Sequence, residues 1–89
     1  MAYFWPMKKE LMNAILLALK ELGGKATTSE INDKVAIILN IPDEALTIED
    51  ENSTGTAYSY KMRWARTELK GKGYIKNPVR GTWELVNND

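Results

Sequence analysis

The chain has 89 residues, of which 44% are apolar, and its 12 cationic and 12 anionic side chains give no net charge. This size suits a single domain with one small core, which we expect to span residues 1–89. Cysteine and histidine are both absent, and the lack of cysteine excludes disulfides, thiolate catalysis and cysteine-ligated zinc.

The chain begins with a predicted helix. Pro6 is a favourable first helical residue, and apolar residues then recur at helical spacing as far as Leu22. Gly23 and Gly24 end this helix because glycine readily adopts the left-handed conformation of a helix C-terminus. A short extended segment around Ala26 follows.

A second helix is predicted from a capping signal. Thr27 and Glu30 have the spacing of a capping box, in which each side chain binds a free N–H group at the helix start. This helix ends before Pro42, since a residue that precedes proline is disfavoured in helical conformation. Residues 42–56 are acidic and then small and polar, which is typical of a loop, and we expect one helical turn at residues 43–46.

The remaining elements are a third main helix and a β-hairpin. The helix is expected at residues 57–72, closed by Gly73, and its inward side chains are Tyr58, Met62, Ala65 and Leu69. Residues 74–77 and 82–86 alternate in polarity around the sequence PVRG, which predicts two strands and a turn. Three main helices and a C-terminal hairpin indicate an α+β fold of the winged helix-turn-helix type, in which the hairpin is the wing.

Charge is unevenly distributed along the chain. Residues 1–53 carry five cations and nine anions, whereas residues 54–89 carry seven cations and three anions. On a helix at 57–72, Arg63, Arg66 and Lys70 fall within about 60° of one another, beside Ser59. A solvated helix face is one interpretation of this stripe, and an anion-binding face is the other.

Base edges are usually read by the N-terminal half of a recognition helix, and a wing contacts phosphate or the minor groove. Arginine suits guanine or phosphate because its guanidinium presents a bidentate fork, whereas lysine is a point charge for phosphate. We therefore predict a DNA-binding set that consists of Ser59, Tyr60, Lys61, Arg63, Arg66, Lys70, Lys76 and Arg80.

Five of the large aromatic residues have predicted roles outside this set. Trp64 is expected to be structural, covering the second side of the third helix against the acidic loop or the first helix, with base stacking as the alternative. Trp83 is expected in the core because it alternates with Leu85. Residues 3–5, which are Tyr, Phe and Trp, are expected to pack against the first helix or a second copy of the chain.

The segment YKMRWARTELKGKGYIKNPVRGTWEL (60–85) resembles the N-terminal domain of Mrr-type restriction-system proteins. The features that carry the resemblance are the string WART at 64–67, Leu69, Gly73 before Tyr74 and Ile75, and the turn RGTW at 80–83. Pro6 followed by Leu11 and Met12 is similar to that family's first helix. The resemblance implies a winged-helix domain that binds DNA and is joined to a separate nuclease domain attacking modified DNA. These 89 residues contain no nuclease domain, so we expect a fragment or a stand-alone module.

A nuclease-like signature does occur, in Pro42 and Asp43 together with Glu68 and Lys70. Residues two apart on a helix diverge by about 200°, so Glu68 and Lys70 could not share a site. The acidic run at 49–51 lacks the alternating ligands and turn glycine of a calcium loop. We therefore expect no catalytic residues, no cofactor and no metal site.

These patterns predict a non-catalytic module that binds double-stranded DNA. The absence of a membrane-spanning run or a secretory signal predicts a cytoplasmic location and no membrane partner. The alternative is a protein-interaction or dimerisation domain of a restriction-system protein. In that case the aromatic residues 3–5 would contact a second copy of the chain, or a nuclease domain or subunit.

Overall fold

Four helices and three strands follow one another in the described part of the chain, which covers residues 3–51 and 54–86 of a computed structural model. The α+β class, the order of the elements and the helical turn at 43–46 agree with the prediction. In chain order the elements are α1 (Lys8–Glu21), β1 (Lys25–Thr27), α2 (Thr28–Ile38), α3 (Asp43–Leu46), α4 (Ala57–Gly71), β2 (Ile75–Val79) and β3 (Thr82–Leu85).

The helix ends follow from local chemistry. The predicted capping box of α2 is confirmed, since Thr27 Oγ1 accepts from Glu30 N at 3.1 Å and Glu30 Oε1 accepts from Thr27 N at 2.9 Å. Helix α1 begins at Lys8, two residues after Pro6, and Glu10 Oε1 accepts from Met7 N at 3.2 Å. Gly23 follows α1 with φ of 90°, as expected for a residue that ends a helix.

The three strands form one antiparallel sheet in the order β1-β3-β2. Ala26 of β1 lies opposite Trp83 of β3, and Lys76 of β2 lies opposite Glu84 of β3. The β2–β3 register shifts between Lys76 and Val79, and β2 ends at Val79, two residues beyond the predicted 74–77 segment. The sheet therefore joins the C-terminal hairpin to the segment between α1 and α2.

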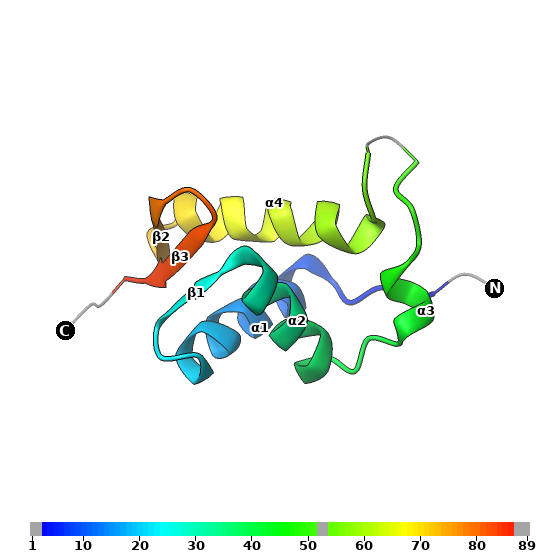
Figure 1. The fold of residues 1–89 in the computed structure, drawn as a ribbon, viewed down its shortest axis with the longest axis horizontal. Coiled ribbons are helices and arrows are strands. Elements are labelled where there is room, and N and C mark those ends of the chain that lie inside the picture. Colours follow the sequence, from blue (N-terminus) through cyan, green and yellow to red (C-terminus); the bar gives the residue numbers. More distant parts are fainter. Residues whose placement is uncertain (1–2, 52–53, 87–89) are drawn as a thin grey trace.

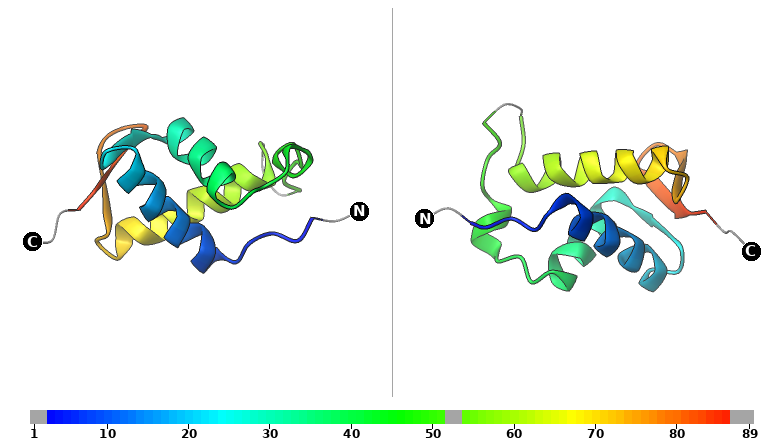
Figure 2. Two further views of the ribbon diagram at one scale, coloured as in Figure 1. Left: turned by 90° about the horizontal axis from the view of Figure 1, so that it is seen from below. Right: turned by 180° about the vertical axis from the view of Figure 1, so that it is seen from behind.

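Helix α4 forms one layer of the molecule, and α1 and α2 form the other (Figure 1). The β2–β3 hairpin stands at the C-terminal end of α4, and the loop from α3 rises at its N-terminal end; Figure 2 shows the same arrangement from two other sides. One face of α4 is thus left open between two projecting segments. The largest fully buried side chains lie between the layers and are Leu11, Ile15, Leu19, Ile31, Val35, Met62, Leu69 and Ile75.

The N-terminal segment, residues 3–7, packs against α4. The ring of Trp5 is nearly parallel to that of Tyr58, with centroids 6.3 Å apart, and Tyr3 meets Trp5 edge to face at 4.9 Å. The prediction named the first helix or a second copy of the chain as the partner, but the aromatic partner of Trp5 is Tyr58 of α4. Phe4 differs from its neighbours because 96% of its surface is exposed.

None of the helices in the described residues has the length and apolar character that a membrane span requires.

Candidate nucleic-acid interface

Helix α4 has one buried face and one exposed face. Thr56 caps the helix by accepting from Ser59 N at 3.1 Å, and the predicted inward residues are all buried. The opposite side is exposed. We refer to its five exposed polar residues as the open face of α4; they are Ser59, Tyr60, Arg63, Thr67 and Lys70.

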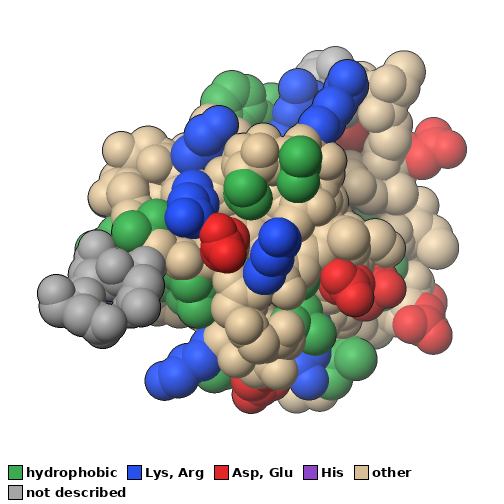
Figure 3. Space-filling model, turned by 60° about the vertical axis from the view of Figure 1, so that its left-hand side comes forward, with side chains coloured by type: hydrophobic (Ala, Val, Ile, Leu, Met, Phe, Trp, Pro, Cys, Tyr) green, Lys and Arg blue, Asp and Glu red, His purple; other side chains and the backbone are tan. Residues whose placement is uncertain are grey.

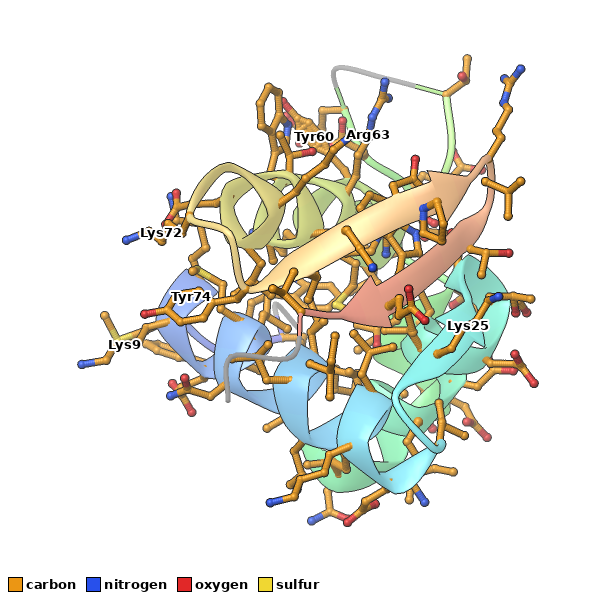
Figure 4. All side chains as sticks on the ribbon, turned by 90° about the vertical axis from the view of Figure 1, so that its left-hand side faces the viewer. Lys9, Lys25, Tyr60, Arg63, Lys72 and Tyr74 are labelled. Atoms are coloured by element: carbon orange, nitrogen blue, oxygen red, sulfur yellow. The ribbon has the colours of Figure 1, made fainter. Side chains whose placement is uncertain are left out.

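Side chains on the open face point away from the rest of the molecule. Figure 4 shows Tyr60 and Arg63 projecting from α4 on the side opposite α1 and α2. The ion pairs within residues 3–51 and 54–86 leave out Arg63 and Lys70, so neither cation is neutralised by a carboxylate there. An anionic ligand would therefore meet two uncompensated charges.

Arg66 does not belong to this face, and the prediction that it forms part of an exposed stripe is wrong. Only 7% of Arg66 is exposed. Its Nη1 donates to Oδ1 of Asn32 at 2.7 Å, and its Cζ lies 5.7 Å from the ring centre of Trp83. Burial lowers the pKa of the guanidinium because it disfavours the charged form. The Arg66 guanidinium thus contacts Asn32 of α2 and Trp83 of β3, and these contacts take the place of a contact with DNA.

The two predicted cations of the hairpin differ in their surroundings. Arg80 lies in the turn between β2 and β3, is exposed, and has no ion-pair partner in the described residues. Lys76 pairs across the hairpin with Glu84, with Nζ 3.2 Å from Oε1. Asn77 fixes the turn, since its Nδ2 donates to the carbonyl oxygens of Val79 and Thr82. Arg80 is therefore presented on a braced turn.

Lys61 lies on a different flank of α4 from Arg63. Its Nζ is 5.7 Å from the ring centre of Trp5, which is within the range of a cation–π contact. The prediction grouped Lys61 with Ser59, Tyr60 and Arg63 as candidates for base contact, whereas the structure places it against Trp5 of the N-terminal segment. A contact with DNA through Lys61 would have to include this flank.

A family comparison bears on these residues. Residues 9–88 match the model of the family described as the Mrr N-terminal domain. The chain belongs to this family. No curated protein and no solved structure gives a match. The match confirms the resemblance carried by residues 60–85, and it covers α1 to β3.

The charge distribution of this Mrr N-terminal domain is visible on its surface. Figure 3 shows Lys and Arg side chains across the upper and left part of one face, while Asp and Glu side chains gather mainly toward the right. Sequence reasoning left two exposed cations out of the predicted set, Lys9 of α1 and Lys72 at the end of α4. In Figure 4 both point toward the same side of the molecule. Helical spacing within α4 could not relate them because Lys9 belongs to another helix.

Trp64 is the largest departure from the predicted site. It was expected to be covered by the acidic loop or the first helix, but 55% of it is exposed. Its ring meets that of Tyr60 at 67°, with centroids 6.2 Å apart. In this Mrr N-terminal domain Trp64 therefore stands against Tyr60 at the edge of the open face. Trp83, by contrast, packs against the core as predicted.

The nuclease-like signature is not assembled in the described residues of this domain. Glu68 Oε1 lies 2.6 Å from Lys8 Nζ, and this hydrogen bond lowers the pKa of Glu68. Asp43 lies in α3, in a hollow whose lining does not include Glu68 or Lys70. No group of three or more acidic, cysteine or histidine side chains suited to a metal ion occurs among the described residues.

Proposed function

We propose that this Mrr N-terminal domain is a non-catalytic winged helix-turn-helix module that binds double-stranded DNA. Helix α4 would be the recognition helix and the β2–β3 hairpin the wing. The order of the elements supports this proposal, since a helix, a strand, two main helices and a hairpin follow one another as in that fold. The place of β3 between β1 and β2 also supports it, because the hairpin is then held firmly to the body.

The observation that carries the proposal is the group of unpaired cations around the open face of α4. Arg63 and Lys70 lie on the helix and Arg80 lies at the tip of the hairpin, and none has a carboxylate partner in the described residues. A helix that enters the major groove while a hairpin tip follows the backbone would need this distribution.

The side chains divide into two roles. Ser59, Tyr60 and Arg63 lie in the N-terminal half of α4, from which base edges are usually contacted, and arginine can bind guanine with two hydrogen bonds. Lys70 and Arg80 would contact phosphates, which supply affinity without sequence choice. Arg66 is omitted because it is buried.

The test is a titration of duplex DNA by fluorescence anisotropy at several salt concentrations. With about four or five phosphates neutralised, log K should fall with log salt at a slope of about −4. Lys70→Ala and Arg80→Ala should each weaken binding and reduce that slope by about 1, whereas Arg63→Ala should weaken binding and relax the choice of sequence. Lys20→Ala is the matched control, because Lys20 is an exposed cation near the end of α1. A binding constant that does not change with salt concentration would contradict the proposal.

The family membership supports a role for the proposed DNA contact in a restriction system whose nuclease would lie in another domain. In this arrangement the domain would bring a nuclease to DNA and would not cleave it. A comparison of DNA cleavage with and without a nuclease-bearing partner tests this point. Cleavage by the purified domain alone would contradict it.

One observation favours a second function, which is protein interaction. Phe4 is 96% exposed and Met7, three residues later, is also exposed, although both neighbours of Phe4 in sequence pack against the chain. A second copy of the chain or a nuclease subunit would cover these side chains. A sedimentation coefficient that rises with protein concentration, together with no shift of DNA, would support this function over DNA binding.

A further inference from the structure

Tyr60 and Trp64 form an exposed aromatic pair one helical turn apart on α4. Tyr60 is 37% exposed and Trp64 is 55% exposed, although a domain of this size needs its large aromatic side chains for the core. The rings meet edge to face with centroids 6.2 Å apart. Because an edge-to-face pair covers only one ring face, flat aromatic surface remains free for a ligand.

The pair stands between two hollows of similar size. One has a volume of about 320 Å³ and the other about 310 Å³, which is the lower end of the range of about 300–1,000 Å³ for ligand sites. Residues 60 and 64 line both. The first hollow is otherwise lined by Thr54, Thr56, Ser59 and Arg63, and the second by Pro6, Lys8, Leu11, Asp50 and Lys61.

The lining of the first hollow has the chemistry of a nucleotide site. Hydroxyl groups and the Arg63 guanidinium supply hydrogen-bond donors, and the described residues that line the hollow include no carboxylate to repel a phosphate. Arg63 has no ion-pair partner in the described part of the chain. A planar ring placed against Trp64 would bring its own phosphate toward this guanidinium. Aromatic side chains beside such cations are the usual stacking surfaces for unpaired bases.

We propose that Tyr60 and Trp64 form a stacking site for an unpaired base of a nucleic-acid strand, with the adjoining phosphate held by Arg63. The proposal rests on the proposed DNA-binding function and adds a ligand class to it. A paired base presents only its edge to the groove, whereas an unpaired base exposes the face that a free aromatic ring can cover. The site thus selects DNA with a locally unpaired nucleotide.

The experiment compares two duplexes that differ by one extra, unpaired thymidine. Stacking should make the bulged duplex bind about 5- to 150-fold more tightly than the plain duplex. Trp64→Leu should abolish this preference and leave the affinity for the plain duplex unchanged. Trp64→Phe, which keeps an aromatic face, should retain part of it. Tyr74→Leu is the matched control, since Tyr74 is a half-exposed aromatic residue elsewhere, and it should keep the whole preference.

Two further probes identify the ligand that the site takes. An eight-residue oligothymidylate should quench the fluorescence of the wild type in a manner that requires Trp64. Thymidine monophosphate should bind far more weakly than the oligonucleotide. Equal binding of both would assign the site to free nucleotides and overturn its role on a strand. Thermal unfolding of each variant is the control for folding, and a midpoint close to that of the wild type shows that the fold is kept.

The outcomes separate this proposal from the proposed function. If plain and bulged duplexes bind equally well, the stacking site is wrong and the duplex-binding function stands. If the oligothymidylate binds through Trp64 but neither duplex binds, the stacking site stands and the duplex function is wrong. Failure of all nucleic-acid probes overturns both.

Discussion

Arg66 of α4 donates from Nη1 to Oδ1 of Asn32 in α2 across 2.7 Å. Tyr58 donates from its hydroxyl group to the carbonyl oxygen of the same asparagine at 2.6 Å. The Arg66 guanidinium also lies over the ring of Trp83 in β3. One arginine therefore joins α4 to both α2 and the hairpin, and we expect its removal to affect stability before it affects any ligand.

Replacement of Arg66 tests this structural role. Arg66→Met keeps the aliphatic length but leaves Asn32 Oδ1 without its partner, and hydrogen bonds to charged groups contribute about 1.5–3 kcal/mol. Burial already lowers the pKa of Arg66, so the loss of a buried charge offsets part of the effect. We expect the free energy of unfolding in urea to fall by about 2 kcal/mol. Arg63→Met, at an exposed site, should change it by no more than about 0.5 kcal/mol. Equal stabilities of the two variants would contradict the role.

The second prediction concerns the hydrogen bond between the side chains of Trp83 and Thr28. Trp83 Nε1 donates to Thr28 Oγ1 at 2.9 Å, and Thr28 N donates to the carbonyl oxygen of Gly81 at 3.0 Å. A double-mutant cycle with Trp83→Phe and Thr28→Val should therefore give a coupling of about 1 kcal/mol in the free energy of unfolding. Thr47→Val, directly after α3, is the matched control and should be additive with Trp83→Phe. Additivity in both cycles would show that the bond does not hold the hairpin.

Sequence reasoning located the elements because their signals are local. The inner side of α4 is defined by the spacing of Tyr58, Met62, Ala65 and Leu69, and all four are buried. The start of α2 is defined by two residues three positions apart, and their reciprocal hydrogen bonds are present. In both cases the information lies within one or two helical turns, where periodicity and capping determine the structure.

The wrong predictions concern side chains at the margins of the buried face of α4, whose exposure depends on residues far away in the sequence. A helical projection placed Arg66 beside the core but could not tell that Asn32, 34 positions away, would cover it. Trp64 was expected to lie on the second side of α4 against the acidic loop or the first helix, yet 55% of it is exposed. The roles of Ser59, Tyr60, Lys61, Arg63, Lys70, Lys76 and Arg80 in DNA binding stay predictions.

The capping box of α2 gives a third prediction. Thr27→Ala removes the side-chain oxygen that accepts from Glu30 N, and loss of such a cap costs about 1 kcal/mol. The midpoint of thermal unfolding should fall accordingly, by about 4–8 °C for a domain of this size. Ser29→Ala, an exposed change two residues later in the same first turn, should leave the midpoint nearly unchanged. Equal midpoints for the two variants would show that the cap contributes nothing.

Alkaline pH should weaken the fold through Tyr58. Burial raises the pKa of its hydroxyl well above the usual value of about 10, and the nearby charge of Asp33 acts in the same direction. The unfolded chain therefore loses this proton first as pH rises. Protonated Tyr58 contributes fully to the free energy of unfolding below about pH 10. Above that pH the contribution is lost, at up to about 1.4 kcal/mol per pH unit.

Denaturant unfolding of the wild type and Tyr58→Phe between pH 8 and pH 11.5 measures this effect. At pH 8 the variant should be less stable by about 1 kcal/mol, because the hydrogen bond to Asn32 O is absent. Above pH 10 the difference should shrink and then reverse, since phenylalanine has no proton to lose. Tyr74→Phe, at a half-exposed site, should follow the wild type across the range. A constant gap between wild type and Tyr58→Phe would mean that the Tyr58 hydroxyl ionises equally readily in the folded and unfolded chains.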